Sequence, residues 1–250
     1  MTEITFENEW PQKTDFRIVP VFEGQELSPA AAALDKDAGG VLSRAMERAG
    51  KAFRGKPGQT LLIPVCTGLE AGEGVLLLGL GKPAELDRDQ VERAGSAVFD
   101  ALAGYEDTLL ALGVDLVDGL GMDGAALAAL LAEAFTLKRY RFDRYRRLPG
   151  KDPEEEQGGQ KGPARLTLVL DQQDQAEKLY AARKPVIEGV FWARDLVTEP
   201  PNVLYPESFA QNIAETLKPL GVKVEIFDEK KLKKLGMGGM IAVGQGSVRP

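Results

Sequence analysis

The residues that could do chemistry in this sequence are carboxylates, lysines and arginines, because histidine is absent and cysteine occurs once. The 250 residues include 38 acidic and 31 basic side chains and no histidine. Histidine-ligated zinc sites, Ser-His-Asp triads and Cys-His dyads are therefore excluded within these residues. A metal ion bound here would need ligands from carboxylates, lysine, cysteine or backbone oxygens.

The single cysteine, Cys66, directly follows an apolar run at residues 61–65. A thiol in apolar surroundings is unreactive, so the sequence predicts a buried, inert side chain rather than a nucleophile. One cysteine cannot form an intrachain disulfide, which is typical of a reducing compartment.

A pair of carboxylates, Asp195 and Glu199, lies one helical turn apart. Such a pair could contribute ligands to a divalent cation, but two ligands are too few for a site. The favoured interpretation places Asp195 against Arg194 or nearby backbone, and Glu199 in the turn that follows the helix.

A glycine-rich turn, Gly79-Leu80-Gly81-Lys82-Pro83-Ala84, follows an apolar run and matches one form of the dinucleotide-binding pattern. Glycines of this kind let backbone N–H groups approach a phosphate at a helix N-terminus. Pro83 removes one donor, however, and Asp87, where the next helix is predicted to begin, would repel a phosphate. The sequence favours a structural turn, with phosphate or nucleotide binding as the alternative.

Two clusters of basic residues could contact a polyanion. Residues 138–147, KRYRFDRYRR, interleave six cations with three aromatic rings, which is typical of nucleic-acid binding. Because the whole chain carries a net charge of −7, we favour an extended edge segment whose arginines pair with the acidic run 152–156 or with another subunit. The second cluster, a solvated face on a short helix, contains Lys230, Lys231, Lys233 and Lys234.

Alternating strands and helices would position these residues. Short apolar or alternating runs predict strands over residues 15–22, 59–65, 74–80, 107–114 and 165–170. Helical periodicity predicts helices over residues 37–49, 88–103 and 123–137, the last two capped by Asp87 and Asp123. This order predicts an α/β fold, with a mixed sheet flanked by helices.

Residues 149–163 contain proline, glycine and charge but no apolar side chain, which indicates a loop or linker. Beyond them the sequence predicts a helical stretch from about residue 173 that is interrupted at Pro185, and a helix that begins near Pro206. A strand over 222–227, a short helix capped by Asp228 and a strand over 239–243 follow. We therefore expect an N-terminal domain at 1–165, a linker strand and helix at 166–185, and the incomplete start of a second α/β domain at 186–250.

Residues 193–202, ARDLVTEPPN, followed by Tyr205-Pro206-Glu207, closely resemble the leucyl aminopeptidase (cytosol aminopeptidase) family. Residues 234–239, KLGMGG, and 243–247, VGQGS, extend the resemblance. The N-terminal part is similar more loosely, through 75–82 and 140–145. Thr198 stands where the family usually has asparagine. The resemblance covers essentially the whole chain.

The resemblance implies a macro-domain-like N-terminal domain that supports a homohexamer. It also implies a hydrolase that removes N-terminal residues from peptides, with two divalent metals (Mn or Zn) held by carboxylates and a lysine. The family motifs that carry these ligands resemble K-G-x-x-F-D-[ST]-G-G and N-T-D-A-E-G-R, and neither occurs in residues 1–250. No catalytic, cofactor-binding or metal-ligating residue is therefore assigned, and this chain by itself is expected to serve folding and oligomerisation.

The expected location is the cytoplasm, because the polar, acidic N-terminus is unlike a signal peptide and no apolar run is long enough to span a membrane. The expected partners are further copies of the chain, and a peptide substrate only with the missing catalytic part. Membranes and nucleic acid are not expected partners. The alternative function is a macro-domain-like binding module for phosphate-bearing ligands such as ADP-ribose, or for DNA through residues 138–147.

Overall fold

The computed structural model describes residues 3–64, 72–114, 119–145, 162–163 and 165–249. The chain divides into two compact units, Met1–Phe191 (unit 1) and Trp192–Pro250 (unit 2). Each unit is described by itself.

Unit 1 is built on a mixed sheet. The strands are β1 (Glu3–Glu7), β2 (Phe16–Phe22), β3 (Glu26–Leu27), β4 (Thr60–Pro64), β5 (Gly74–Gly81), β6 (Leu109–Gly113) and β7 (Arg165–Val169). Their order is β1-β7-β6-β2-β5-β4, and β3 pairs with β2. Neighbours from β1 to β5 run parallel, whereas β4 and β3 are antiparallel to β5 and β2. The predicted α/β fold with a mixed sheet is confirmed, and each strand predicted before residue 171 is present.

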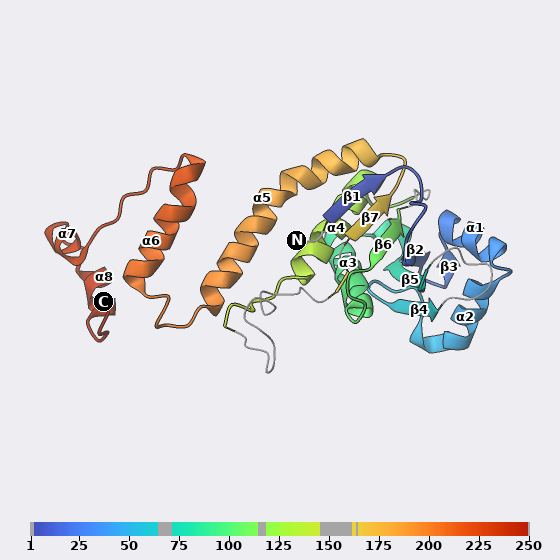
Figure 1. Cartoon of the computed structure of the whole chain (residues 1–250), viewed down its shortest axis with the longest axis horizontal. Helices are drawn as coiled ribbons and strands as arrows, with labels where there is room; N and C mark the ends of the chain where they lie inside the picture. The colour runs from blue at the N-terminus through green and yellow to red at the C-terminus, as the bar shows by residue number, and fades with distance from the viewer. Residues whose placement is uncertain (1–2, 65–71, 115–118, 146–161, 164, 250) are drawn as a thin grey trace. The chain divides into compact units, whose positions relative to one another are not determined.

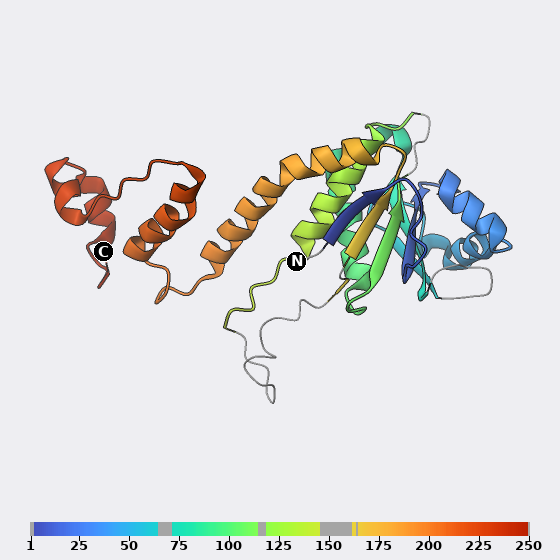
Figure 2. The ribbon, with the colours of Figure 1, turned by 45° about the horizontal axis from the view of Figure 1, so that its top comes forward.

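Helices cover both faces of this sheet (Figures 1 and 2). They are α1 (Pro29–Asp37), α2 (Val41–Ala49), α3 (Arg88–Leu102), α4 (Gly124–Lys138) and the first part of α5 (Gln173–Thr198), with one-turn helices at Gly50–Ala52 and Pro83–Glu85. One core packs α1 and α2 against the sheet, and the other packs α3, α4 and α5 against the opposite face. Residues of β5 alternate between the two cores and are all buried, which explains its continuous apolar run.

Carboxylates cap three helices of unit 1. The predicted caps are confirmed, since Asp87 accepts from the backbone N–H of Gln90 at 2.9 Å and Asp123 from that of Ala126 at 3.3 Å. The first residues of α2 instead use a side chain from α1, because Asp35 Oδ1 accepts from Leu42 N at 2.7 Å. That contact explains why an aspartate is buried here.

Three elements near the start of the chain were not predicted, namely β1, the two-residue strand β3 and α1. The strand β1 pairs with β7 at the sheet edge, and only Ile4 and Phe6 contact the core. Its five residues do alternate, but with exposed glutamates at both ends the pattern is short and weak. The helix α1 begins after Ser28, whose hydroxyl accepts from Ala31 N at 3.3 Å.

The predicted interruption at Pro185 is wrong, because α5 continues through this residue to Thr198. A proline inside a helix cannot donate to the carbonyl four residues earlier, here that of Ala181. Both residues are exposed, so water can bond the freed carbonyl and the helix need not end.

Unit 2 is helical in its described residues. After the end of α5 it contains α6 (Pro206–Leu217), a one-turn helix at Lys218–Leu220, α7 (Glu229–Lys234) and α8 (Gly238–Gly244). The cap of α7 is confirmed, since Asp228 accepts from Lys231 N at 2.8 Å.

The two strands predicted in unit 2 are both wrong. Residues 222–228 have no regular structure, and residues 238–244 are helical. A strand needs a neighbour for its backbone hydrogen bonds, and the described residues of unit 2 include no strand that could pair with either run. A short apolar run such as 239–243 fits a strand or a helix equally well by pattern alone.

Candidate functional site

The segment that resembles a peptidase, residues 193–207, is the end of α5 and a compact turn into α6. Thr198 donates its hydroxyl hydrogen to the carbonyl of Arg194 at 2.8 Å, within the last turn of the helix. The backbone N–H groups of Val203 and Leu204 both donate to the carbonyl of Pro200 at 2.9 Å. The backbone N–H of Tyr205 then donates to Ser208 Oγ at 2.9 Å, which fixes the start of α6.

Arg249 ties this turn to the end of the described chain. Its guanidinium carbon lies 4.5 Å from the centre of the Tyr205 ring, and its Nη1 donates to the carbonyl of Asn202 at 3.0 Å. Two of the stretches that carry the resemblance, 193–207 and 243–247, are thus brought together, because Ser247 lies two residues before Arg249. Within the same unit Trp192 Nε1 donates to Asn212 Oδ1 at 2.8 Å.

The carboxylates Asp195 and Glu199 lie in this segment as predicted. They are linked by backbone, since Glu199 N donates to the carbonyl of Asp195 at 3.0 Å. Across the described residues, no group of three or more cysteine, aspartate, glutamate or histidine side chains is arranged to hold a metal ion.

In the glycine-rich turn at 79–84, the backbone N–H groups of both glycines already donate hydrogen bonds to backbone carbonyls. Gly79 N donates to the carbonyl of Gln59 at 2.8 Å, and Gly81 N to that of Gly55 at 2.8 Å. A Cβ on Gly79 would lie 2.2 Å from the carbonyl oxygen of Lys56, so close packing explains that glycine. Because both N–H groups already have acceptors, the geometry favours the structural turn over phosphate binding.

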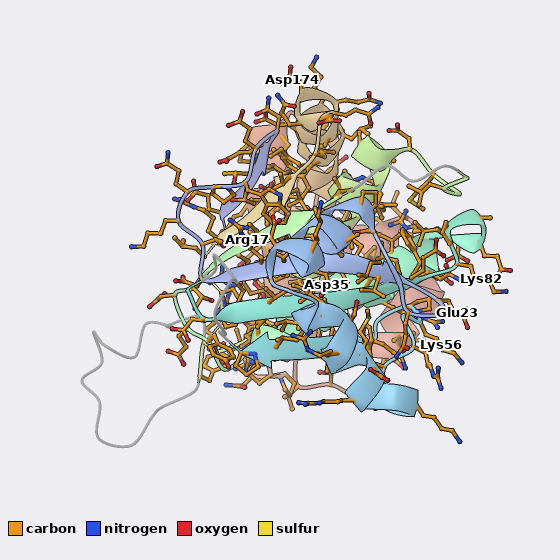
Figure 3. The ribbon with its side chains drawn as sticks, turned by 90° about the vertical axis from the view of Figure 1, so that its right-hand side faces the viewer. Arg17, Glu23, Asp35, Lys56, Lys82 and Asp174 are labelled. Atoms are coloured by element: carbon orange, nitrogen blue, oxygen red, sulfur yellow. The ribbon has the colours of Figure 1, made fainter. Side chains whose placement is uncertain are left out.

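One ion pair lies at this turn, among other charges of both signs. Figure 3 shows Lys82, Glu23 and Lys56 at the same end of the strands. Lys82 Nζ lies 2.8 Å from Glu85 Oε1. The hydrogen bond and charge of Glu85 raise the pKa of Lys82, and Glu23 adds a smaller effect.

The basic segment 138–147 forms no strand in its described part, residues 138–145. Its cations do not share one open surface, because Lys138 Nζ lies 2.9 Å from Asp100 Oδ2 and Arg139 is only 9% exposed. Burial lowers the pKa of Arg139, with Asp107 opposing that effect. The acidic run 152–156, the expected partner of these arginines, lies outside the described residues, as does Cys66.

The lysine-rich helix α7 is partly paired within its own unit. Lys231 forms an ion pair with Glu225, and its Nζ lies 4.0 Å from the centre of the Phe227 ring. Lys233 Nζ lies 2.6 Å from Glu229 Oε1. These contacts agree with a solvated helix face.

Sequence reasoning missed a buried charge cluster centred on Glu133 of α4. The side chain of Glu133 is 6% exposed, and its oxygens lie 2.7 Å from Arg183 Nη1 and 3.6 Å from Arg88 Nη2. The cluster therefore links α3, α4 and α5. The sequence did contain a signal, because the Ala/Leu-rich stretch 124–137 has a single carboxylate. A carboxylate in a helix that is apolar all round is expected to be buried, and a buried charge is expected to have a partner of opposite sign.

Comparison with known proteins begins with the fold. The chain resembles a mutant of tomato leucine aminopeptidase with a TM-score of 0.75 at 21% identity, over 94% of this chain and 46% of the other. It resembles the bottromycin maturation enzyme BotP, which is also solved in complex with Mn, with a TM-score of 0.67 at 26% identity, over 95% of this chain. The fold is thus leucine aminopeptidase-like.

The sequence comparisons define the family. Residues 18–149 match the model of the N-terminal domain of the cytosol aminopeptidase family, and residues 191–250 match that of its catalytic domain. The chain belongs to the cytosol aminopeptidase family, and the resemblance inferred from the sequence is confirmed.

Curated relatives agree with this assignment. A probable cytosol aminopeptidase of Azotobacter vinelandii is 38% identical over 243 residues, which is 95% of this chain and 46% of the relative. The cytosol aminopeptidase of Pseudomonas aeruginosa strain PAO1 is 40% identical over 245 residues, again 95% and 46%. The chain thus spans less than half the length of these relatives. Within the described residues, no helix has the length and apolar character needed to cross a membrane.

Proposed function

We propose that this chain is the N-terminal portion of a leucyl-type metalloaminopeptidase that removes N-terminal residues from peptides. The observation that carries the proposal is that two parts of one chain match the two domains of the same family, at residues 18–149 and 191–250. The contacts of Arg249 with Asn202 and Tyr205 support it, because they join the stretches that carry the peptidase resemblance.

In this proposal the residues that bind metal belong to the part of the catalytic domain that the chain does not supply. Two divalent metals, Mn or Zn, would polarise the scissile carbonyl and activate water there. The role of this chain is to form the N-terminal domain and the first segment of the catalytic domain, and to support a homohexamer in the cytoplasm. BotP in complex with Mn supports manganese as a candidate metal.

We further infer the division of the chain into an N-terminal domain at 1–165, a linker at 166–185 and the start of the catalytic domain at 186–250. The two family matches fall on either side of that linker. The alternative function, a phosphate- or DNA-binding module, is not favoured by the paired N–H groups of Gly79 and Gly81 or by the burial of Arg139.

A chimera tests the proposal. Residues 1–250 are joined to the part of the Pseudomonas aeruginosa cytosol aminopeptidase that follows the matching region, and hydrolysis of leucine p-nitroanilide is measured with and without Mn²⁺. We expect metal-dependent turnover by the chimera and none by the 250-residue chain. The comparison variant is the same chimera with Arg249→Ala, which removes both the ring contact with Tyr205 and the hydrogen bond to the backbone carbonyl of Asn202 and should lower turnover.

Two results would contradict the proposal. One is robust metal-dependent hydrolysis by the 250-residue chain alone. The other is a chimera that folds and assembles, as judged by circular dichroism and sedimentation, but has no peptidase activity with any of Mn²⁺, Zn²⁺ or Mg²⁺.

A further inference from the structure

Unit 1 contains a cavity of about 420 Å³ between the end of α4, the middle of α5 and the edge strand β1. Figures 1 and 2 show these three elements side by side. Its lining includes Thr136, Arg139, Tyr140, Tyr180, Lys184 and Phe191. This volume is within the range of about 300–1,000 Å³ that is typical of small-ligand pockets. Neither the peptidase resemblance nor the family assignment accounts for it.

Aromatic rings form the walls of this cavity. The rings of Tyr140 and Phe191 are stacked with their centres 5.5 Å apart. Tyr180 is 5% exposed, and its hydroxyl is within 3.1 Å of Thr136 Oγ1, so the ring is held in place. Flat, fixed apolar surfaces of this kind suit the ring of a bound molecule.

The charge around the cavity is positive. Arg139, Arg141 and Lys184 line it, against the carboxylates Glu3 and Glu188. Glu3 is already engaged, because Arg165 donates to its Oε2 from Nε at 2.9 Å and from Nη2 at 2.6 Å. Arg139 is 9% exposed and has Asp107 as a nearby opposite charge, whereas Arg141 and Lys184 are exposed cations of the lining that a bound carboxylate would contact.

We propose that this cavity binds a small carboxylate that carries an aromatic ring. The carboxylate contacts Arg141 and Lys184, whose Nζ lies 5.5 Å from the centre of the Tyr180 ring, and the ligand's ring packs against the stacked pair Tyr140 and Phe191. Two sources present this chemistry: a free aromatic acid, and the C-terminal carboxylate of a peptide that ends in an aromatic residue.

Calorimetric titration of the whole chain tests the assignment. The probes are phenylacetate, its neutral analogue phenylacetamide, N-acetyl-alanyl-phenylalanine and inorganic phosphate; the acetylated peptide has no free N-terminus, so peptidase activity does not affect the result. We expect phenylacetate to bind and phenylacetamide to bind at least about tenfold more weakly, since the carboxylate makes charge-assisted contacts. If the acetylated peptide binds more tightly than phenylacetate, the natural ligand is a peptide C-terminus. If phenylacetate binds more tightly, the natural ligand is a free aromatic acid.

A matched pair of double variants locates the binding. Arg141→Gln with Lys184→Gln removes two exposed cations of the cavity, and Arg48→Gln with Lys178→Gln removes two exposed cations elsewhere in unit 1. The first pair should weaken phenylacetate binding by about tenfold or more, and the second by less than about twofold, because distant exposed charges are screened. Circular dichroism confirms that both variants fold.

Several outcomes would overturn the proposal. They are absence of binding at about 10 mM phenylacetate, which lies well above the Kd expected of a specific small-ligand site; equal binding of the amide; equal weakening by both double variants; and phosphate binding as tight as that of phenylacetate.

Discussion

The two units of this chain differ most in what they bury. Unit 1 encloses its sheet between two apolar cores, and side chains such as Leu76, Leu77 and Leu78 are fully buried. In the described residues of unit 2 only Ala214 is buried, while Val243 is 89% exposed and Leu235 54% exposed. Burial of apolar surface is the main favourable term in folding. Unit 1 therefore has the means to fold by itself, whereas the described residues of unit 2 have no comparable core.

The largest expected difference between the units comes from matched truncations. Leu78→Ala in β5 removes a fully buried side chain and should lower the free energy of unfolding by about 2–5 kcal/mol. Leu235→Ala removes a side chain that is 54% exposed and should change it by less than about 0.5 kcal/mol. Urea unfolding followed by circular dichroism gives both values. Equal losses would show that unit 2 has a core of its own.

A smaller effect is expected at the charge cluster that links α5 to unit 1. Glu133→Gln weakens the contact with Arg183 and leaves a buried neutral amide, which should cost about 1–3 kcal/mol. The matched control is Glu92→Gln, because Glu92 also contacts Arg88 but its side chain is 44% exposed, and it should cost less than about 0.5 kcal/mol. Thermal unfolding of the two variants, measured side by side, compares their losses of stability. Equal losses would show that the buried cluster does not hold α5 against α3 and α4.

Helix caps with the same chemistry provide a third comparison. Asp87→Ala removes the acceptor for Gln90 N in unit 1 and should lower stability by about 1 kcal/mol. Asp228→Ala removes the equivalent contact with Lys231 N in unit 2. We expect it to leave the main unfolding transition unchanged, because α7 has only six residues and no buried side chain. A shift of that transition by Asp228→Ala would mean that the two units unfold together.

The smallest effect concerns pH. Burial raises the pKa of Tyr180, although its hydrogen bond with Thr136 opposes this. Because the folded pKa lies above the unfolded one, the contribution of Tyr180 to stability is fully present below the unfolded tyrosine pKa and is lost as pH rises from there through the folded pKa. Spectrophotometric titration of the phenols should show one tyrosine that ionises late, absent in Tyr180→Phe and retained in Tyr145→Phe, since Tyr145 is 53% exposed. Persistence of the late phenol in Tyr180→Phe would contradict this.

The sequence predicted unit 1 well because its signals are local. Asp87 and Asp123 precede clear helical periodicity, and the continuous apolar run in β5 is typical of a strand buried on both faces. The predictions failed where partners decide the outcome. Residues 222–227 alternate like a strand but have no strand beside them in the described unit, and residues 239–243 form a helix instead. Pro185 did not end α5, because solvent at an exposed position can replace the lost hydrogen bond.

The candidate sites follow the same division. The motifs at 193–207 identified the family, because a sequence motif can be recognised without knowing how the chain folds. The cavity beside α5 was invisible to sequence reasoning, since its lining comes from β1, from the end of α4 and from α5, which are far apart in the chain. The cation Arg139 was identified in the basic segment, but its burial depends on those other elements.

Amide hydrogen exchange of the 250-residue chain, followed by mass spectrometry, tests the contrast between the units most directly. The account predicts that peptides from β2, β5 and β6 exchange only through global unfolding, while those from α6, α7 and α8 exchange orders of magnitude faster. Equal protection of both sets in the isolated chain would contradict it, because unit 2 would then be stable without further protein surface.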